Sequence, residues 1–287
     1  MKEINKEILA EIYKERDPQS RKYDFGLVVV IGGSEFYSGS PALSAMAAFR
    51  TGADMVRIIA PQRAADIIAS FNPNMAAYPL EGKRVGKNHL STLISMTESA
   101  KSVSRGNVAV VLGGGIGRSE ETQETILEYL SKLTVPVVID ADAIYAIKDN
   151  LEVLKDKECL VTPHYFEFFS LTGREVYELP LEEKIKAVRK EAERMGITIL
   201  LKGETDIISD GKDVLINKIG SPYLTVGGSG DTLAGVAGAL VSRKIPLLKA
   251  GGAAAFINAS AGSLAAKTLK DSMTATDLID NINEIIK

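Results

Sequence analysis

Short apolar segments alternate with amphipathic segments along most of the chain. The apolar runs have the length and the β-branched composition of buried strands; they span 27–33, 55–61, 108–114, 135–141, 159–163 and 198–203. Hydrophobic residues at helical spacing lie between them at 40–52, 120–133 and 180–196. Strands that alternate with helices predict an α/β fold with a mostly parallel central sheet and helices on both faces.

The two ends of the chain have different patterns. Residues 1–24 place Ile and Leu among charged residues, which predicts an N-terminal helical extension and fits neither a signal peptide nor a transmembrane segment. The run 247–269 carries few charges and resembles a membrane span, but its glycine pairs and Asn258 favour a buried helix. No linker or repeat divides the chain, so we expect one domain over 1–287.

Composition narrows the possible partners. The net charge is −3 and the Lys and Arg residues are dispersed, so neither nucleic acid nor a membrane surface is expected as a partner. The only cysteine, Cys159, excludes an intrachain disulfide and is expected in the core. These features predict a cytoplasmic protein. Of the two histidines, His89 is expected at the surface without a function.

Polar residues and glycines follow one predicted strand after another. They are Gly32 and Gly33, Gly113–Gly117, Asp140 and Asp142, His164, and Lys202. Each also suits an ordinary turn, but the carboxyl ends of parallel strands share one edge of a sheet, where ligands bind. We therefore expect one site. In it, Asp140 and Asp142 either close a strand-end turn or contact water or magnesium near phosphates.

The segment "TVGGSGDTLAG" (225–235) joins a glycine-rich turn to a predicted helix that begins at about residue 231. Its backbone N–H groups suit an anion hole over Gly228, Ser229 and Gly230 at the positive end of the helix dipole. Asp231 is either an acid at a helix start or a general base beside a transferring phosphoryl group. The run "GGGIG" (113–117) lacks the dinucleotide-binding spacing, and no Walker sequence is present.

Six blocks of the sequence resemble the ADP- or ATP-dependent (S)-NAD(P)H-hydrate dehydratases of the ribokinase-like superfamily. They occur in the family's order, at 28–56, 112–119, 137–144, 160–173, 199–211 and 225–235. The resemblance implies a ribokinase-like fold and a hydro-lyase that repairs (6S)-NADHX and NADPHX, the hydrated forms of NADH and NADPH. It also implies that ADP or ATP, with Mg²⁺, phosphorylates the C6 hydroxyl, that AMP or ADP is released, and that phosphate then leaves.

The resemblance also implies roles for individual residues. Asp231 would be the base, and Gly230 with its neighbours the anion hole. Segment "KGETD", Lys202, Gly203, Glu204, Thr205 and Asp206, would contact the nucleotide together with Gly230. The hydrated dinucleotide would be lined by Ser40, Tyr37, Gly115, Gly117, His164 and Asp231. Glu167 matches the family glutamate and joins Asp140 and Asp142 as a metal or water contact.

Alternatives remain open at several positions. Family members commonly carry Ala at the position of Ser40 and Thr at that of Asp206. His164 also suits a helix cap, Lys202 a structural ion pair, and Tyr37 a packing role. For the whole chain the alternatives are a small-molecule kinase such as a hydroxyethylthiazole kinase, which leaves phosphate on its product, and a non-catalytic nucleotide sensor. A separate NAD(P)H-hydrate epimerase is an expected functional partner, and a homo-oligomer, possibly a tetramer, is expected.

Overall fold

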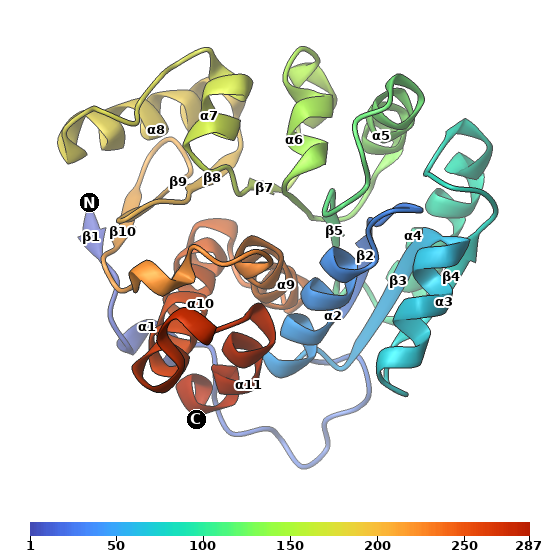
Figure 1. Ribbon diagram of the computed structural model, residues 1–287, viewed down its shortest axis with the longest axis horizontal. Helices are drawn as coiled ribbons and strands as arrows, with labels where there is room; N and C mark the ends of the chain where they lie inside the picture. Colours follow the sequence, from blue (N-terminus) through green and yellow to red (C-terminus); the bar gives the residue numbers. More distant parts are fainter.

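A ten-stranded sheet runs through the computed structural model, which describes all residues 1–287 (Figure 1). The strands are β1 Lys2–Glu3, β2 Leu27–Ile31, β3 Met55–Pro61, β4 Ala76–Leu80, β5 Val108–Leu112, β6 Val137–Ile139, β7 Cys159–Val161, β8 Thr198–Leu201, β9 Asp206–Ser209 and β10 Val214–Asn217. Their order across the sheet is β1-β10-β9-β8-β7-β6-β5-β2-β3-β4. Strands β2 to β8 all run parallel to one another, whereas β9 is antiparallel to both its neighbours, β8 and β10.

Helices cover both faces of this sheet. They are α1 Glu7–Ala10, α2 Gly39–Arg50, α3 Gln62–Phe71, α4 Leu90–Val103, α5 Glu120–Lys132, α6 Asp142–Ile147, α7 Tyr165–Thr172, α8 Leu181–Met195, α9 Ser229–Ser242, α10 Leu247–Leu269 and α11 Ala275–Ile286. One hydrophobic core contains residues of α2, α3, α9, α10 and α11, and the other contains residues of α4 to α8. Figure 1 shows α5 to α8 on one side of the sheet and α2, α9, α10 and α11 on the other.

Successive side chains of the central strands point to opposite faces of the sheet, and so contribute in turn to the two hydrophobic cores. In β2, Leu27, Val29 and Ile31 belong to the core beneath α4 to α8, whereas Val28 and Val30 belong to the core beneath α9. Every residue of β2 is buried. A parallel strand covered on two faces needs apolar residues at successive positions, which is why these strands read as continuous apolar runs. The predicted α/β architecture is therefore confirmed.

The order of the strands reverses between β2 and β5. The chain proceeds from β2 to β3 and β4 on one side, then returns to place β5 to β8 on the other side of β2. In open parallel sheets such a reversal is where ligands bind, because the helices that follow the two strands cover opposite faces of the sheet. Gly32 and Gly33 begin the loop after β2, and Gly113–Gly117 begin the loop after β5.

The predicted N-terminal helical extension is wrong in its main feature. Residues 1–24 contain a single helical turn, Glu7–Ala10, and otherwise strand β1 and irregular backbone. Ile4, Leu9 and Ile12 still bury their side chains in the core beside α10, so the apolar spacing reflects packing without a continuous helix. Cys159 is fully buried in β7, as predicted, and burial raises the pKa of its thiol to about 12.

Helix α10 is buried on the sheet, as its small residues predict. Small side chains allow the helix backbone to approach its neighbours closely; Gly251 packs beside Leu160 of β7 and Ile208 of β9. No helix in the structure combines the length and apolarity needed to cross a bilayer.

Candidate active site

The glycine turn lies at the N-terminus of α9, which begins at Ser229, two residues earlier than predicted. Gly228 holds the N-cap position with φ +94°, where a Cβ would lie 2.6 Å from Leu43 and 2.9 Å from Ala275. The backbone N–H groups of Gly230 and Asp231 donate to no group in the protein. Two unpaired donors at the positive end of a helix are the groups that an anion hole requires, and the binding of an anion here stays a prediction.

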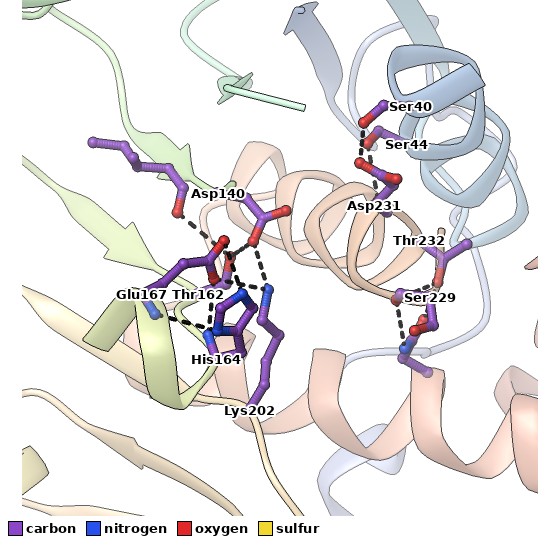
Figure 2. A network of polar contacts seen from close by, with 12 residues as sticks. Ser40, Ser44, Asp140, Thr162, His164, Glu167, Lys202, Ser229, Asp231 and Thr232 are labelled. Carbon is purple, nitrogen blue, oxygen red and sulfur yellow. Dashed lines mark hydrogen bonds and ion pairs between the residues drawn. The ribbon is translucent and has the colours of Figure 1, made fainter. Parts of the chain in front are cut away.

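Asp231 lies in the first turn of α9 and faces α2 (Figure 2). The Ser40 hydroxyl donates to Asp231 Oδ1, and the Ser44 hydroxyl donates to the Asp231 main-chain oxygen at 2.9 Å. Burial raises the pKa of the Asp231 carboxyl to about 6, the Ser40 hydrogen bond opposes that rise, and the nearby Asp140 adds to it. A carboxylate with a pKa near 6 is a stronger base than an exposed aspartate and is still ionised at neutral pH.

Lys202 follows β8 and lies across from Asp231, between two acids (Figure 2). Its Nζ is 2.9 Å from Asp140 Oδ1 and 3.7 Å from Glu167 Oε2. Burial alone would lower the pKa of this ammonium, but Asp140 and Glu167 outweigh burial and raise it. A Cβ on Gly230 would lie 3.4 Å from Lys202 Nζ, so the ammonium also borders the anion hole.

Asn258 of α10 fixes the first turn of α9 from the opposite side. Its Nδ2 donates to the Ser229 carbonyl at 3.2 Å, and its Oδ1 accepts from the Thr232 hydroxyl at 2.7 Å. Asn258 and Thr232 are both buried. Because a buried amide with satisfied partners has one favoured orientation, this contact holds the unpaired N–H groups in place.

The loops after β2 and β5 contact each other beside Asp231. Gly33 N donates to the Gly114 carbonyl at 2.9 Å, and a Cβ on Gly114 would lie 2.8 Å from Asp231 Oδ1. Gly115 adjoins Tyr37, where a Cβ would approach the tyrosine ring to 3.0 Å. The structure therefore brings Tyr37, Ser40, Gly115 and Asp231 together, and their contact with a dinucleotide stays a prediction; Tyr37 is about half exposed at 48%.

Asp142 holds the second glycine loop. Its carboxylate accepts from Gly117 N at 3.0 Å and from Arg118 Nε at 2.6 Å. Between Asp140 and Asp142, Ala141 has φ +52° and ψ −123°, a conformation that a residue with a Cβ adopts only under strain. This strained residue directs one aspartate toward Lys202 and the other toward Gly117.

His164 caps α7. Its Nδ1 accepts from Phe166 N at 3.1 Å and Glu167 N at 3.2 Å, while Glu167 Oε2 accepts from His164 N at 2.9 Å. The capping alternative for His164 is thus present in the structure. The ring remains half exposed, and contact with a dinucleotide stays a prediction.

The "KGETD" segment forms the turn between β8 and β9. Asp206 accepts from Gly203 N at 3.1 Å and from Asn217 Nδ2 at 3.0 Å, so its carboxylate closes the turn. Burial raises the pKa of Asp206 to about 6. Gly203 and Glu204 are exposed, and Thr205 is partly exposed. This arrangement leaves the turn accessible to a nucleotide.

The three acids proposed as metal or water contacts are engaged to different degrees. Asp142 and Glu167 use their oxygens for the contacts above, and Asp140 Oδ1 accepts from Thr162 at 2.7 Å as well as from Lys202. Asp140 Oδ2 has no donor in the protein, and no group of three or more acids, histidines or cysteines gathers at one point. Such a donor set fits Mg²⁺ only if phosphates and water supply most of its ligands, which is the usual case for nucleotide-bound Mg²⁺.

Sequence reasoning missed several residues of the site and misplaced one histidine. Ser44, Thr162, Thr232 and Asn258 were not predicted as parts of it, although Ser44 lies four positions after Ser40 and so on the same face of α2. His89, expected at the surface, is buried, and its ring contacts Gly86 N at 3.1 Å and the Glu81 carbonyl at 2.9 Å.

The chain has a ribokinase-like fold. A ribokinase-like superfamily protein from Enterococcus faecalis has the same fold, with a TM-score of 0.85 over 99% of this chain and 95% of that chain, at 23% identity. A profile of the NAD(P)H-hydrate dehydratase family matches residues 28–284. The chain belongs to this family.

Two relatives illustrate the match. An ADP-dependent (S)-NAD(P)H-hydrate dehydratase from Cenarchaeum symbiosum is 34% identical over 285 residues, which cover 99% of this chain and 96% of the relative. A bifunctional NAD(P)H-hydrate repair enzyme from Pyrobaculum aerophilum is 42% identical over 274 residues, or 95% of this chain. This chain spans about half the length of that bifunctional relative, 52%.

Proposed function

We propose that this protein converts (6S)-NADHX and NADPHX to NADH and NADPH in a nucleotide-dependent dehydration. The observation that carries the proposal is the position of Asp231, a partly buried carboxylate in the same helical turn as two unpaired N–H groups and across from the Lys202 ammonium. A base beside an anion hole suits phosphoryl transfer to a hydroxyl. The relatives' names identify the hydroxyl as that of a hydrated nicotinamide.

The proposed reaction has two stages. Asp231 accepts the proton of the C6 hydroxyl while the hydroxyl oxygen attacks the terminal phosphorus of the nucleotide. AMP then leaves from ADP, or ADP leaves from ATP. The ring nitrogen lone pair then expels inorganic phosphate as the C6–O bond breaks. Loss of a proton from C5 restores the C5–C6 double bond. Phosphorylation is useful because phosphate is a far better leaving group than hydroxide.

Lys202 and the start of α9 stabilise the charge that shifts during transfer. The N–H groups of Gly230 and Asp231 are placed to donate to phosphoryl oxygens, and the Lys202 ammonium compensates negative charge at the same point. Mg²⁺ bound with the nucleotide would neutralise phosphate charge, and Asp140 offers its free carboxylate oxygen directly or through water. The "KGETD" turn begins with Lys202 and is the proposed contact of the adenosine part.

The test is incubation with chemically hydrated NADH, magnesium, and either ADP or ATP. The proposal expects the absorbance of the dihydropyridine to return, with one inorganic phosphate released for each NADH formed. ADP is the expected donor, since the Cenarchaeum relative is named ADP-dependent. A phosphorylated product that keeps its phosphate would identify a small-molecule kinase instead. Nucleotide binding without turnover of any hydrate would identify a sensor.

The proposal extends to partners and location. Since only the S hydrate is the proposed substrate, a separate epimerase would convert the R form, and the bifunctional names of several relatives agree with that pairing. We propose a cytoplasmic enzyme that forms a homo-oligomer such as a tetramer. Exposed aromatic residues on and after α7, Phe166, Phe169 and Tyr177, offer an apolar surface for self-association. Sedimentation equilibrium measures the oligomeric state directly.

A further inference from the structure

We propose that Ser40 is a positioning residue that commits Oδ1 of Asp231 to a hydrogen bond and so reserves Oδ2 as the oxygen that takes the substrate's proton. The inference rests on the function proposed above and names a role in it for a residue of α2. A role for Ser40 in holding the base differs from the dinucleotide contact that the resemblance implies for this position.

The first support is the geometry between α2 and α9. Ser40 and Ser44 are separated by one helical turn, face the same side of α2 and are both buried at 2% exposure. Ser40 donates to the Asp231 carboxylate, and Ser44 donates to the main-chain oxygen of the same residue (Figure 2). One helix therefore holds both the backbone and the side chain of Asp231.

The second support is the closeness of the two helices. A Cβ on Gly235, one turn beyond Asp231, would lie 2.1 Å from the Ser44 carbonyl. Only glycine allows α9 to approach α2 this closely. The approach brings the Ser40 hydroxyl within reach of the carboxylate without any long, mobile side chain, so little conformational entropy is lost when the contact forms.

The third support is what each carboxylate oxygen contacts. Oδ1 accepts from Ser40, whereas Oδ2 of Asp231 has no donor in the protein. Rotation about the Cβ–Cγ bond of an aspartate is broad and lets either oxygen face the substrate. A hydroxyl that donates to one oxygen restricts this rotation. Removing Ser40 would free that rotation and also remove a donor to the ionised form.

The ionisation of Asp231 responds to groups on four neighbouring elements. Burial favours the neutral acid most strongly, the Ser40 hydrogen bond favours the ionised form, Asp140 and Asp142 favour the neutral form, and Lys202 favours the ionised form. Without the Ser40 hydroxyl, the pKa of Asp231 should rise further above about 6. The low-pH limb of activity, where the base becomes protonated, should then move to higher pH.

The test compares Ser40→Ala, Ser40→Thr and Ser44→Ala with the wild-type protein. Kinetics are measured with hydrated NADH and saturating ADP from pH 5 to 9, and Asp231 is titrated independently by carboxyl ¹³C NMR, with Asp231→Asn identifying its signal. For Ser40→Ala we expect kcat about tenfold lower on the high-pH plateau, because one hydrogen bond to a charged group is lost. We also expect a higher midpoint pH for the ionisation of Asp231, both in the pH dependence of kcat and in the NMR titration, and a near-normal KM for ADP.

The other two variants separate positioning from packing. Ser40→Thr retains the hydroxyl and should recover the wild-type midpoint and most of kcat. Ser44→Ala loses only a contact with the main chain of Asp231, so it should keep the wild-type midpoint whatever its effect on Tm. Unchanged kcat and unchanged midpoint in Ser40→Ala would overturn the inference, as would an equal midpoint shift in Ser44→Ala. A wild-type protein inactive on every hydrate would overturn the proposed function, while the NMR titration would still decide the Ser40 contact.

Discussion

Lys202 Nζ lies 2.9 Å from Asp140 Oδ1 at the centre of the site, with 19% of the lysine side chain and 4% of the aspartate side chain exposed. Asp140 follows β6 and Lys202 follows β8, so the strands of the sheet determine the distance between them. Glu167, at 3.7 Å, gives the ammonium a second acidic neighbour. A buried ion pair of this kind holds a charge in position even where it adds little net stability.

Replacement of Lys202 tests this arrangement. Lys202→Met leaves Asp140 and Glu167 buried without their cation, and loss of one partner of a buried pair costs about 3–5 kcal/mol in the free energy of unfolding. Nucleotide affinity should fall as well. The double variant Lys202→Met/Asp140→Asn should recover much of the stability without recovering nucleotide affinity.

Lys212→Met, at an exposed turn, is the matched control and should change neither quantity. Denaturant unfolding and calorimetric titration with ADP and Mg²⁺ measure both effects. Unaltered ADP affinity in a folded Lys202→Met protein would contradict the proposed contact with phosphate.

Asp231→Asn separates catalysis from stability. The turnover number should fall by roughly 10²–10⁴-fold, the usual contribution of a general base. Nucleotide affinity should persist or increase, because a charge beside the phosphates is removed. The Asp231 pKa of about 6 lies above its ordinary value, so the stability associated with the protonated form is present below about pH 4 and is lost as the pH rises through 6.

Asp231→Asn should therefore unfold at a higher temperature than the wild-type protein at pH 8, and the difference should disappear near pH 4. The gain in the free energy of unfolding at pH 8 should be at most about 3 kcal/mol, since a pKa of about 6 in place of the ordinary value near 4 corresponds to a free energy of that size. Melting curves at both pH values check this, with Asp66→Asn on α3 as an exposed control. Near-normal kcat would contradict the assignment of Asp231 as the base.

Gly230→Val should weaken nucleotide binding and leave the fold intact. Outside its own helix backbone and chain neighbours, a Cβ at this position meets only Lys202 Nζ, at 3.4 Å, so the new side chain would occupy the space in front of the unpaired N–H groups. Gly228→Val differs, because positive φ and contacts with Leu43 and Ala275 make that position intolerant of a side chain. We expect Gly228→Val to lower Tm sharply, whereas Gly220→Val, in open space, should change nothing.

His164 is tested by two replacements that differ in capping ability. His164→Ala removes the cap of α7 and should cost about 1 kcal/mol, whereas asparagine is a good N-cap and His164→Asn should cost less. If the imidazole contacts the hydrated dinucleotide, both variants should raise the KM for the hydrate more than the KM for ADP. A KM that rises only in the destabilised alanine variant would point to the cap alone.

Ala141→Gly should stabilise the protein. Glycine adopts the conformation of Ala141 without strain, and relief of strain of about 1–3 kcal/mol exceeds the extra chain entropy of glycine in the unfolded state, about 0.5–1 kcal/mol. Ala143→Gly, at a buried helical position of α6, should destabilise instead. Thermal melting of the two variants shows whether the signs differ as expected; a lower Tm for Ala141→Gly would contradict the strain.

The sequence predicts the central sheet because its strands are buried on both faces and contain almost no polar residues. The β9–β10 hairpin was not predicted, since "TDIISDGKDVLIN" mixes charges with apolar residues, although its Asp210–Gly211 turn is a hairpin signal. The glycine turn was recognised from local pattern alone. By contrast, the Asp140–Lys202 contact joins residues 62 positions apart, and Asn258 reaches Ser229 from another helix. Such contacts depend on helix and strand placement, which no local pattern specifies.

Two segments of the site share a junction. Lys202 N donates to the Pro163 carbonyl at 2.8 Å, and the Tyr165 hydroxyl packs so closely on Gly203 that a Cβ there would lie 2.3 Å from it. The segment after β7, residues 163–165, carries His164, which is proposed to face the hydrate. The segment after β8, residues 202–206, is the turn that is proposed to face the nucleotide. A ligand that shifts either segment must shift its neighbour, so the two affinities should be thermodynamically linked. Whatever factor ADP imposes on the dissociation constant of the hydrate, the hydrate must impose on that of ADP.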